Sequence, residues 1–296
     1  MRTFIACLVA LSACGQVKGE SIDASPPDEN ADIDSALIDA PIDSAAITPE
    51  VTNVTIPAGV DAEGAKVTLM VSVHAAPNET LTVLLTSTLG AYAPATGMVT
   101  LDANGDGVFS TQFTSGNTAG AEMGTAVARN ALNVDSPAKT FQFPVVALRR
   151  IGNPTQFTTA GSFGPSNLLG QTITIPTSGN LKKLGWITST STEMIKIGIY
   201  TNVGGAPGSL VASIPASTVA IGVNEVALAT PIALAAGTYW FMANYSTTGG
   251  TYKDATTGIT TKYISLPFGD ALPTTFPSTH STYTSNNFNY YVVLGQ

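Results

Sequence analysis

The sequence has little cysteine, histidine or charge, and these shortages exclude several classes of protein. Its 296 residues include two Cys and two His, too few for a disulfide-rich scaffold or a zinc cluster. Charged residues make up 11% of the chain, less than half of the roughly 25% that is usual for a globular domain. Twelve Lys and Arg stand against 20 Asp and Glu, and no basic stretch exceeds two residues, which excludes strong binding to nucleic acid.

The acidic charge is concentrated near the N-terminus. Residues 15–50 carry one base and nine acids, whereas residues 51–296 carry ten bases and eleven acids. The part of the chain that we expect to fold is therefore nearly neutral. The acidic pI of about 4.6 reflects an acidic tail and not a charged binding face.

The first 14 residues have the layout of a secretion signal. Met1-Arg2-Thr3 is a short positive region, residues 4–11 are apolar, and the stretch is too short to span a bilayer as a helix. Leu11-Ser12-Ala13-Cys14 resembles the lipobox of bacterial lipoproteins, which implies removal of residues 1–13 and acylation of Cys14. The alternative is an ordinary signal peptide with a chance Cys. Because Gly15 stands where an Asp would resemble an inner-membrane retention signal, we expect a lipid anchor in the outer membrane or at the cell surface.

Residues 14–50 are predicted to form a disordered tether. The segment has no aromatic residue, is rich in Asp, Ser, Ala and Pro, and repeats the pair Ile-Asp four times. Such a composition cannot bury enough apolar surface to offset the cost of ordering. A flexible chain of this length spans about 30–35 Å. A calcium-binding segment is the competing interpretation, but the acids are scattered singly without fixed ligand spacing.

Residues 51–148 are predicted to form an Ig-like β-sandwich. Stretches rich in Val, Thr, Leu and Phe recur every ten to fifteen residues between turn-forming residues, and seven such strands match that fold. Because no Cys pair joins the sheets, apolar packing must hold them together. The predicted strands are 51–56, 66–74, 80–87, 97–102, 107–113, 122–128 and 139–146.

The stretch from Leu81 to Ala128 also resembles the bacterial Ig-like group 1 domains of invasin and intimin-type surface proteins. The resemblance implies a stalk unit that carries a binding module beyond it. The matching residues are Leu81-Thr82-Val83, Ser87, Gly90, Val99 to Gly105, Phe113-Thr114-Ser115, Thr118-Ala119-Gly120 and Thr125 to Ala128.

One acidic motif could bind a metal. Asp102, Asn104 and Asp106 have the spacing that opens an EF-hand calcium loop, but Phe113 stands where the bidentate Glu belongs and no helices are predicted around it. The alternative is a hairpin turn in which Asn104-Gly105 supplies positive φ angles. We favour the turn and keep a calcium site as the weaker alternative.

Residues 149–296 are predicted to form a jelly-roll-like β-sandwich. Sixteen aromatic residues lie in this segment against five in residues 51–148, and no window keeps a helical period. The apolar region near 219–243 is interrupted by Asn224-Glu225 and Pro231, so it is predicted to be strand, turn and strand and not a membrane span. The predicted strands are 155–159, 170–175, 182–189, 194–201, 209–213, 223–229, 236–245, 260–266 and 288–294.

This segment resembles a recurrent C-terminal β-sandwich module of secreted and surface-anchored bacterial proteins. The resemblance lies in Ile197 to Thr201, Gly204 to Ser213, Pro231 to Trp240 and Asn289 to Val293. Such modules look like carbohydrate-binding jelly rolls, and most have no assigned ligand. The resemblance therefore supports the fold more than it supports any one function.

No catalytic constellation can be assembled from the sequence. It lacks G-x-S-x-G, H-E-x-x-H and P-loop motifs, and the mature chain would have no free thiol. The carboxylates of the last segment are Glu193, Glu225, Asp254 and Asp270, and a glycosidase would need two of them to converge across a cleft. Asp270 and His280 could be drawn as a triad with a Ser, but nothing marks the nucleophile. We expect the protein not to be an enzyme.

A binding face is the more plausible functional feature. Sugars expose apolar C–H patches that stack on aromatic rings, while Asn, Asp and Thr hold their hydroxyls. The candidate ligand contacts are Trp186, Tyr245, Tyr252, Tyr263 and Tyr283.

About half of the aromatic residues must instead fill the core. Along residues 237–245, Trp240 and Met242 share one face while Tyr239, Phe241 and Tyr245 share the other. One of these faces is predicted to be core, and Trp240 is expected to belong to it.

Together these features predict an all-β, lipid-anchored surface protein in which a tether and an Ig-like stalk display a jelly-roll-like module. The leading hypothesis is that this module, without catalysis, binds a glycan or a protein at the cell surface. The second is a structural coat or spacer lipoprotein with no dedicated ligand. The third is a hydrolase that acts on glycans. No cofactor is expected beyond the weak calcium alternative.

Lipidation of Cys14 is directly testable. Mass spectrometry is expected to find acyl chains on the sulfur of Cys14 and no residues 1–13, and cell fractionation is expected to recover the protein with membranes, since several acyl chains anchor a protein stably. A bare thiol at Cys14, or recovery among cytosolic proteins, contradicts the assignment.

Overall fold

The computed structural model describes residues 47–191, 194–248, 250–255, 259–284 and 286–296. These residues belong to one compact unit, Ala46–Gln296. They form strands and no helix, which confirms the predicted all-β fold, and none of their segments is a helix able to cross a membrane. The predicted signal peptide, Cys14, the predicted tether as far as residue 46, and Glu193 lie outside the described residues.

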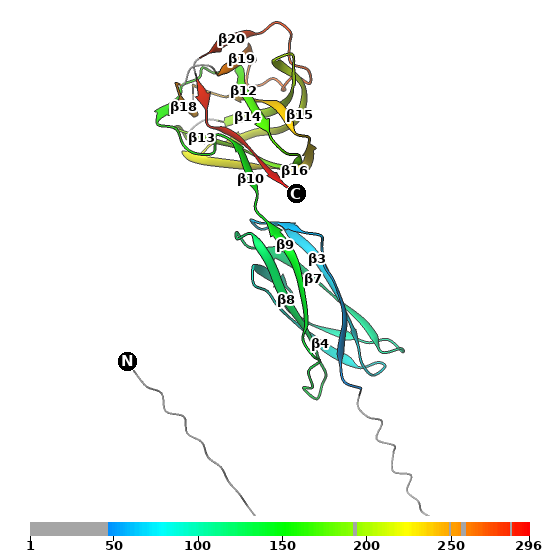
Figure 1. The fold of residues 1–296 in the computed structure, drawn as a ribbon. Helices are drawn as coiled ribbons and strands as arrows, with labels where there is room; N and C mark the ends of the chain where they lie inside the picture. Colours follow the sequence, from blue (N-terminus) through cyan, green and yellow to red (C-terminus); the bar gives the residue numbers. More distant parts are fainter. Residues whose placement is uncertain (1–46, 192–193, 249, 256–258, 285) are drawn as a thin grey trace, which may run out of the picture. The chain divides into compact units, whose positions relative to one another are not determined.

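The first nine strands form the N-terminal sandwich, which runs from blue to green in Figure 1. One sheet has the order β1-β3-β7-β5 and the other the order β2-β9-β8-β4-β6, with β2 and β9 parallel and all other pairs antiparallel. The strands are β1 Glu50–Thr55, β2 Val60–Asp61, β3 Lys66–His74, β4 Thr80–Thr86, β5 Gly90–Ala93, β6 Thr96–Thr100, β7 Asp106–Ser115, β8 Gly120–Arg129 and β9 Lys139–Val146.

Alternating side chains explain why these strands bury one face. Leu69, Val71 and Val73 of β3 are buried, as their period of two predicts. Phe113 of β7 lies at the centre, with its ring 5.3 Å from that of Tyr92 and 5.1 Å from that of Phe143. All seven strands predicted in this segment are present. The short strands β2 and β5 were missed because neither has an alternating apolar pattern.

The acidic motif of the sequence forms a turn. One Asp102 carboxylate oxygen accepts the backbone N–H groups of Asn104 and Asp106 at 2.8 and 2.9 Å. Gly105 has a φ of +85°, and a Cβ there would lie 2.1 Å from the carbonyl oxygen of Ala75. The predicted turn is present, but only Gly105, and not Asn104, has a positive φ. The predicted hairpin is wrong, because β6 and β7 belong to different sheets.

A buried carboxylate stabilises one end of this sandwich. Glu122 is fully buried and accepts the backbone N–H of Leu89 at 2.6 Å and that of Thr88 at 3.2 Å. The hydroxyl of Tyr92 lies 3.4 Å from the same carboxylate. The chain between β4 and β5 is thus held to β8 by one side chain, because buried backbone donors need acceptors.

Replacing Glu122 tests this interaction. Glu122→Gln is expected to lower the free energy of unfolding by about 1–3 kcal/mol, because an amide NH₂ would face the N–H donors that the carboxylate now accepts. Urea unfolding measures the change, and Glu50→Gln, an exposed site on β1, is the matched control. Equal stability of the two variants contradicts the role given to Glu122.

The remaining strands form the C-terminal sandwich, green to red in Figure 1, and all their pairs are antiparallel. Its sheets have the orders β15-β14-β17-β12-β19-β20, β10-β22-β13-β16 and β11-β18-β21. The strands are β10 Arg149–Gly152, β11 Thr159–Ala160, β12 Asn167–Ile175, β13 Gly179–Thr188, β14 Met194–Val203, β15 Ala206–Thr218, β16 Gly222–Leu234, β17 Gly237–Tyr245, β18 Tyr252–Asp254, β19 Thr260–Ser265, β20 Ser281–Thr284, β21 Asn287–Phe288 and β22 Tyr290–Gly295.

The central strands β14 and β17 of the six-stranded sheet are buried on both faces over most of their length. The inner face of this sheet packs on the four-stranded sheet, where the rings of Phe241 and Tyr290 stack with centroids 4.6 Å apart. Its outer face carries Trp240 and Met242, which pack with Phe276 in a second cluster. Trp240 is core, as predicted, but the expectation of a single core face on β17 is wrong because the chain from Leu266 to Phe276 covers the other face.

The strand predicted at 155–159 is absent except for Thr159 at the start of β11. The side chain of the buried Asn289 forms hydrogen bonds with backbone groups of residues 153–157 that a neighbouring strand would otherwise have bonded. Its amide nitrogen donates to the carbonyls of Asn153 and Thr155, and its oxygen accepts the N–H of Phe157 at 2.8 Å. A side chain 132 residues away in sequence thus fixes this loop.

Four charged residues form a compact ionic cluster. Arg150 donates to Glu63 at 2.9 and 3.0 Å and to Glu225 at 2.7 and 3.2 Å. Lys183 lies 3.2 Å from Glu63 and 3.1 Å from Glu225. Hydrogen bonding from Arg150 lowers the pKa of Glu63. Burial acts to raise the pKa of Glu225, but hydrogen bonds from Arg150 and Lys183 outweigh it and the pKa is lowered.

This cluster predicts a pH-dependent contribution to stability. A carboxylate whose pKa is lowered on folding stabilises the protein above its unfolded pKa, here 4.5, and that contribution disappears as the pH falls through the folded pKa. Arg150→Met is therefore expected to be less stable than the wild type at about pH 6, with the deficit shrinking near pH 3. Chemical unfolding at both pH values gives the result.

The matched control is Arg129→Met. Arg129 pairs with Asp135 at 2.6 Å, but the two side chains are 40% and 44% exposed. Solvent screening makes such a pair worth little, so this variant is expected to stay close to the wild type at neutral pH. A deficit in Arg150→Met that is the same at both pH values contradicts the prediction.

Candidate functional site

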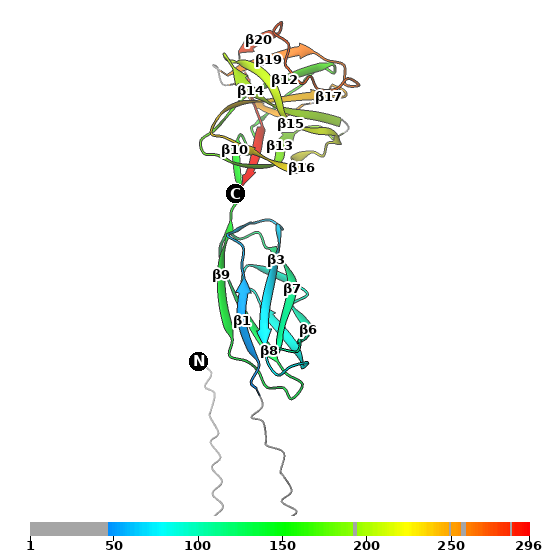
Figure 2. The same ribbon diagram turned by 90° about the vertical axis from the view of Figure 1, so that its right-hand side faces the viewer.

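Two of the predicted tyrosines meet at one end of the six-stranded sheet. β19 pairs with β12, and β20 pairs with β19 at the edge of the sheet. The two strands lie side by side in both views (Figures 1 and 2). Tyr263 is opposite Leu169 of β12 and Tyr283 is opposite Thr261 of β19. The two rings have centroids 5.8 Å apart and planes inclined at 59°. Both side chains are only half-buried.

Two hollows adjoin this pair, one of about 210 Å³ and one of about 460 Å³. Asn167 and Tyr263 line both, so the hollows are adjacent, and we call the two together the tyrosine groove. The smaller hollow is also lined by Ser162, Phe163, Gly164, Leu169 and Tyr283. The larger is also lined by Ile264, Ser265, Pro277, Thr279, His280 and Ser281.

The tyrosine groove combines aromatic surface with uncharged polar groups. Tyr263 and Tyr283 offer ring faces, while Asn167 and the hydroxyl side chains offer donors and acceptors. Burial raises the pKa of Tyr283, which keeps its hydroxyl neutral to a higher pH than that of an exposed tyrosine. None of the described residues lining the groove is Asp, Glu, Lys or Arg. This mixture suits a ligand with C–H patches and many hydroxyls.

The other three aromatic candidates do not line the tyrosine groove. Trp186 and Tyr245 are fully buried in the inner core, which corrects the prediction that they contact a ligand. The hydroxyl of Tyr245 hydrogen-bonds that of Tyr290 at 2.9 Å, so its polar end is used internally. Tyr252 packs against a separate cluster with Tyr291. The alternation of side chains along a strand could not separate the fully buried aromatic residues from the partly buried ones, because it does not show how deeply each strand is buried in the sandwich.

Sequence reasoning missed Asn167, which lines both hollows. Its only local signal is a polar residue directly before the apolar start of β12. The loop residues Ser162 and Thr279 carried no signal, because they reach the groove through the loops that precede β12 and β20. Their placement depends on the tertiary fold.

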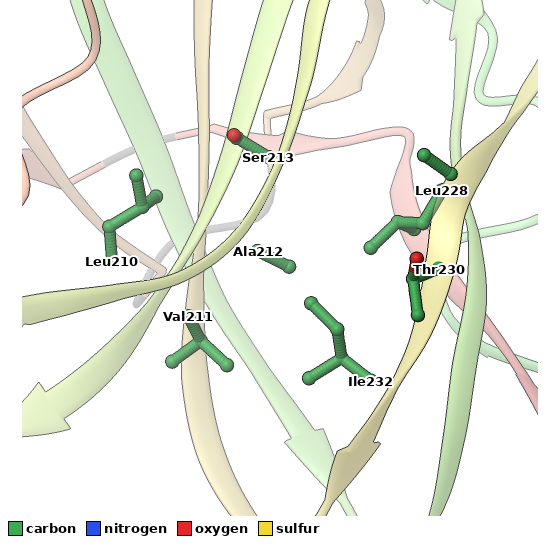
Figure 3. Close-up of a pocket in the computed structure, with 8 residues that line it drawn as sticks. Leu210, Val211, Ala212, Ser213, Leu228, Thr230 and Ile232 are labelled. Carbon is green, nitrogen blue, oxygen red and sulfur yellow. The ribbon is translucent and has the colours of Figure 1, made fainter.

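A second opening, of about 380 Å³, lies between β15 and β16. These are edge strands of different sheets, and Figure 3 shows their side chains on opposite sides of the opening. The register of β16 against β13 moves from Ile232 to Ala227, which leaves residues 228–231 outside the ladder as a bulge. The lining is mostly aliphatic, with Ser213 and Thr230 as its hydroxyl groups and no aromatic residue, so it suits a polar sugar less well than the tyrosine groove does.

The carboxylates considered for catalysis lie in different parts of the sandwich. Glu225 belongs to the ionic cluster with Arg150, Asp254 ends β18 of the three-stranded sheet, and Asp270 lies in an exposed turn. His280 hydrogen-bonds the carbonyl of Pro277 at 3.3 Å. Among the described residues, no three His, Cys, Asp or Glu side chains are grouped so as to hold a metal.

Comparison with known proteins assigns no family. No protein-family model matches the sequence, and no curated protein matches it. Among solved structures, a SusE-like protein matches with a TM-score of 0.21 and 12% identity over 68% of this chain and 97% of that one. An α-L-rhamnosidase from Streptomyces avermitilis, solved with L-rhamnose, matches with a TM-score of 0.19 and 11% identity over 81% of this chain and 24% of the enzyme. These likenesses are too distant to carry an argument about function.

Proposed function

We propose that this chain is a bacterial surface lipoprotein that binds a glycan, without catalysis, in the tyrosine groove. The observation that carries the proposal is the partly buried pair Tyr263 and Tyr283 beside Asn167. Aromatic rings that lie at the margin of the core and line a hollow, beside hydroxyl and amide groups, provide what a sugar ring requires.

The geometry of the pair supports stacking on a sugar. The two planes are inclined at 59°, so a ring that lies flat on one tyrosine meets the edge of the other. Phe163 adds apolar surface to the smaller hollow, and its own ring is fixed by Phe288 at 4.8 Å and Tyr245 at 5.5 Å. A wall held in this way loses little conformational entropy when a ligand binds.

Display at the outer membrane or cell surface is the second part of the proposal. It is supported by the Leu11-Ser12-Ala13-Cys14 sequence and by the acidic, aromatic-free segment that follows it. Acylation of Cys14 would anchor the chain, and the predicted tether, which ends before β1, would separate the folded part from the lipid. The N-terminal sandwich then serves as the stalk for the C-terminal sandwich.

The proposal is tested with residues 47–296 on an array of glycans and cell-wall polymers. The wild type is expected to bind at least one of them. Tyr263→Ala and Tyr283→Ala are each expected to weaken that binding about tenfold or more. A nucleic-acid base stacked on one aromatic side chain gains about 1–3 kcal/mol, and we expect a sugar stacked on a tyrosine ring to gain a comparable free energy.

Tyr252→Ala is the matched control, because Tyr252 is a half-buried tyrosine of the same sandwich that packs on a different cluster. It is expected to bind like the wild type. The melting temperature of each variant shows whether it folds. If no glycan binds, or if folded variants of Tyr263 and Tyr283 bind as the wild type does, the proposed function is wrong.

A further inference from the structure

We infer that the ligand of the tyrosine groove is an uncharged oligosaccharide that occupies both hollows with at least two sugar units. This inference rests on the proposed function and adds the charge and the minimum length of the ligand. Two independent observations carry it: the absence of ionic side chains from the described lining, and the sharing of Tyr263 and Asn167 by the two hollows.

The charge argument starts from where the ionic side chains lie. Arg150 and Lys183 are engaged by Glu63 and Glu225, and Lys182 lies 3.0 Å from Asp61, so these cations are used in structural pairs. The polar side-chain groups that line the groove are hydroxyl, amide and imidazole groups. A uronate or sulfate placed there would lose water without gaining the bidentate partner that Arg provides. An acidic sugar is therefore disfavoured at this site.

The neighbouring cation on β19 does not change this conclusion. Lys262 is adjacent to Tyr263 and projects to the opposite face of the strand. Its ammonium group donates to the hydroxyl of Thr282 at 2.8 Å. Lys196, which lies on β14, donates to the backbone carbonyls of Phe268 and Asp270 and so holds the loop that covers the outer face.

The length argument starts from the sizes of the hollows. Small-molecule sites usually measure about 300–1,000 Å³. The larger hollow, at about 460 Å³, is within this range by itself, whereas the smaller, at about 210 Å³, is below it and extends the larger one. Tyr263 and Asn167 border both, so a ligand that crosses between them contacts the same ring and the same amide with two successive units. Such a ligand makes favourable contacts in both hollows but loses its translational and rotational freedom only once.

The test uses an array that contains matched neutral and acidic polysaccharides, followed by titration with defined fragments. The strongest-binding polymer is hydrolysed to fragments of one to four units, and each is titrated calorimetrically at about pH 8, above the ordinary pKa of imidazole. The affinity is expected to rise about tenfold or more from one unit to two or three. The uronate counterpart of the same chain is expected to bind about tenfold more weakly or worse.

Variants separate the two hollows. Tyr283→Ala alters only the smaller hollow, His280→Ala alters only the larger, and Asn167→Ala alters both. Each of the three is expected to reduce the gain in affinity with chain length, and Asn167→Ala is expected to reduce it most. Tyr252→Ala is again the control. A folding check by melting temperature accompanies each titration.

The outcomes distinguish this inference from the proposed function. An acidic glycan that binds most tightly and depends on Tyr263 overturns the inference while the proposed function stands. A single sugar unit that binds as tightly as the longer fragments overturns the claim of two units. Absence of any binding that depends on Tyr263 and Tyr283 overturns the proposed function, and the inference with it.

Discussion

The two main sheets of the C-terminal sandwich have unequal numbers of strands, and the packing between them determines which side chains reach the surface. The six-stranded sheet ends in β19 and β20, next to β12, and the sheet that it packs on has the order β10-β22-β13-β16. A tyrosine in the covered part of the sandwich becomes core, as Tyr245 and Tyr290 do. Tyr263 and Tyr283, on β19 and β20, pack against the margin of the same core and remain partly buried with the same alternation of side chains. The tyrosine groove lies at this margin.

The side-chain amides of two buried residues, Gln171 and Asn289, hold neighbouring loop and strand segments in place. Gln171 accepts the N–H of Phe288 at 2.7 Å and donates to Asn287 at 2.9 Å, while Asn289 binds the backbone around Asn153 and Phe157. These hydrogen bonds satisfy buried polar groups that a continuous strand would otherwise have satisfied. They fix residues 153–157 beside the core. Further along the same connection, residues 162–164 line the smaller hollow together with Tyr283.

Charge is used sparingly and locally in this chain. Of its few ionic side chains, Glu63, Arg150, Lys183 and Glu225 lie together. Asp61 pairs with Lys182, and these two residues are sequence neighbours of Glu63 and Lys183. The fully buried Glu122 is satisfied by backbone donors. Because these groups act on the fold itself, the groove is left to neutral groups, and recognition there depends on shape, stacking and hydrogen bonds. A site of this kind suits a sugar better than an ion.

The sequence by itself determined the all-β class, most strand positions and the turn at Asp102, because these follow from alternation over neighbouring residues and from the short reach of an Asp side chain. It also predicted that Trp240 is core. It could not separate Trp186 and Tyr245 from Tyr263 and Tyr283, since all four alternate in strands in the same way. Only the tertiary structure decided which of these aromatic residues are fully buried and which line a hollow, and which distant amide replaces a strand at residues 153–157. Those outcomes depend on contacts between residues more than one hundred positions apart, and no local pattern encodes them.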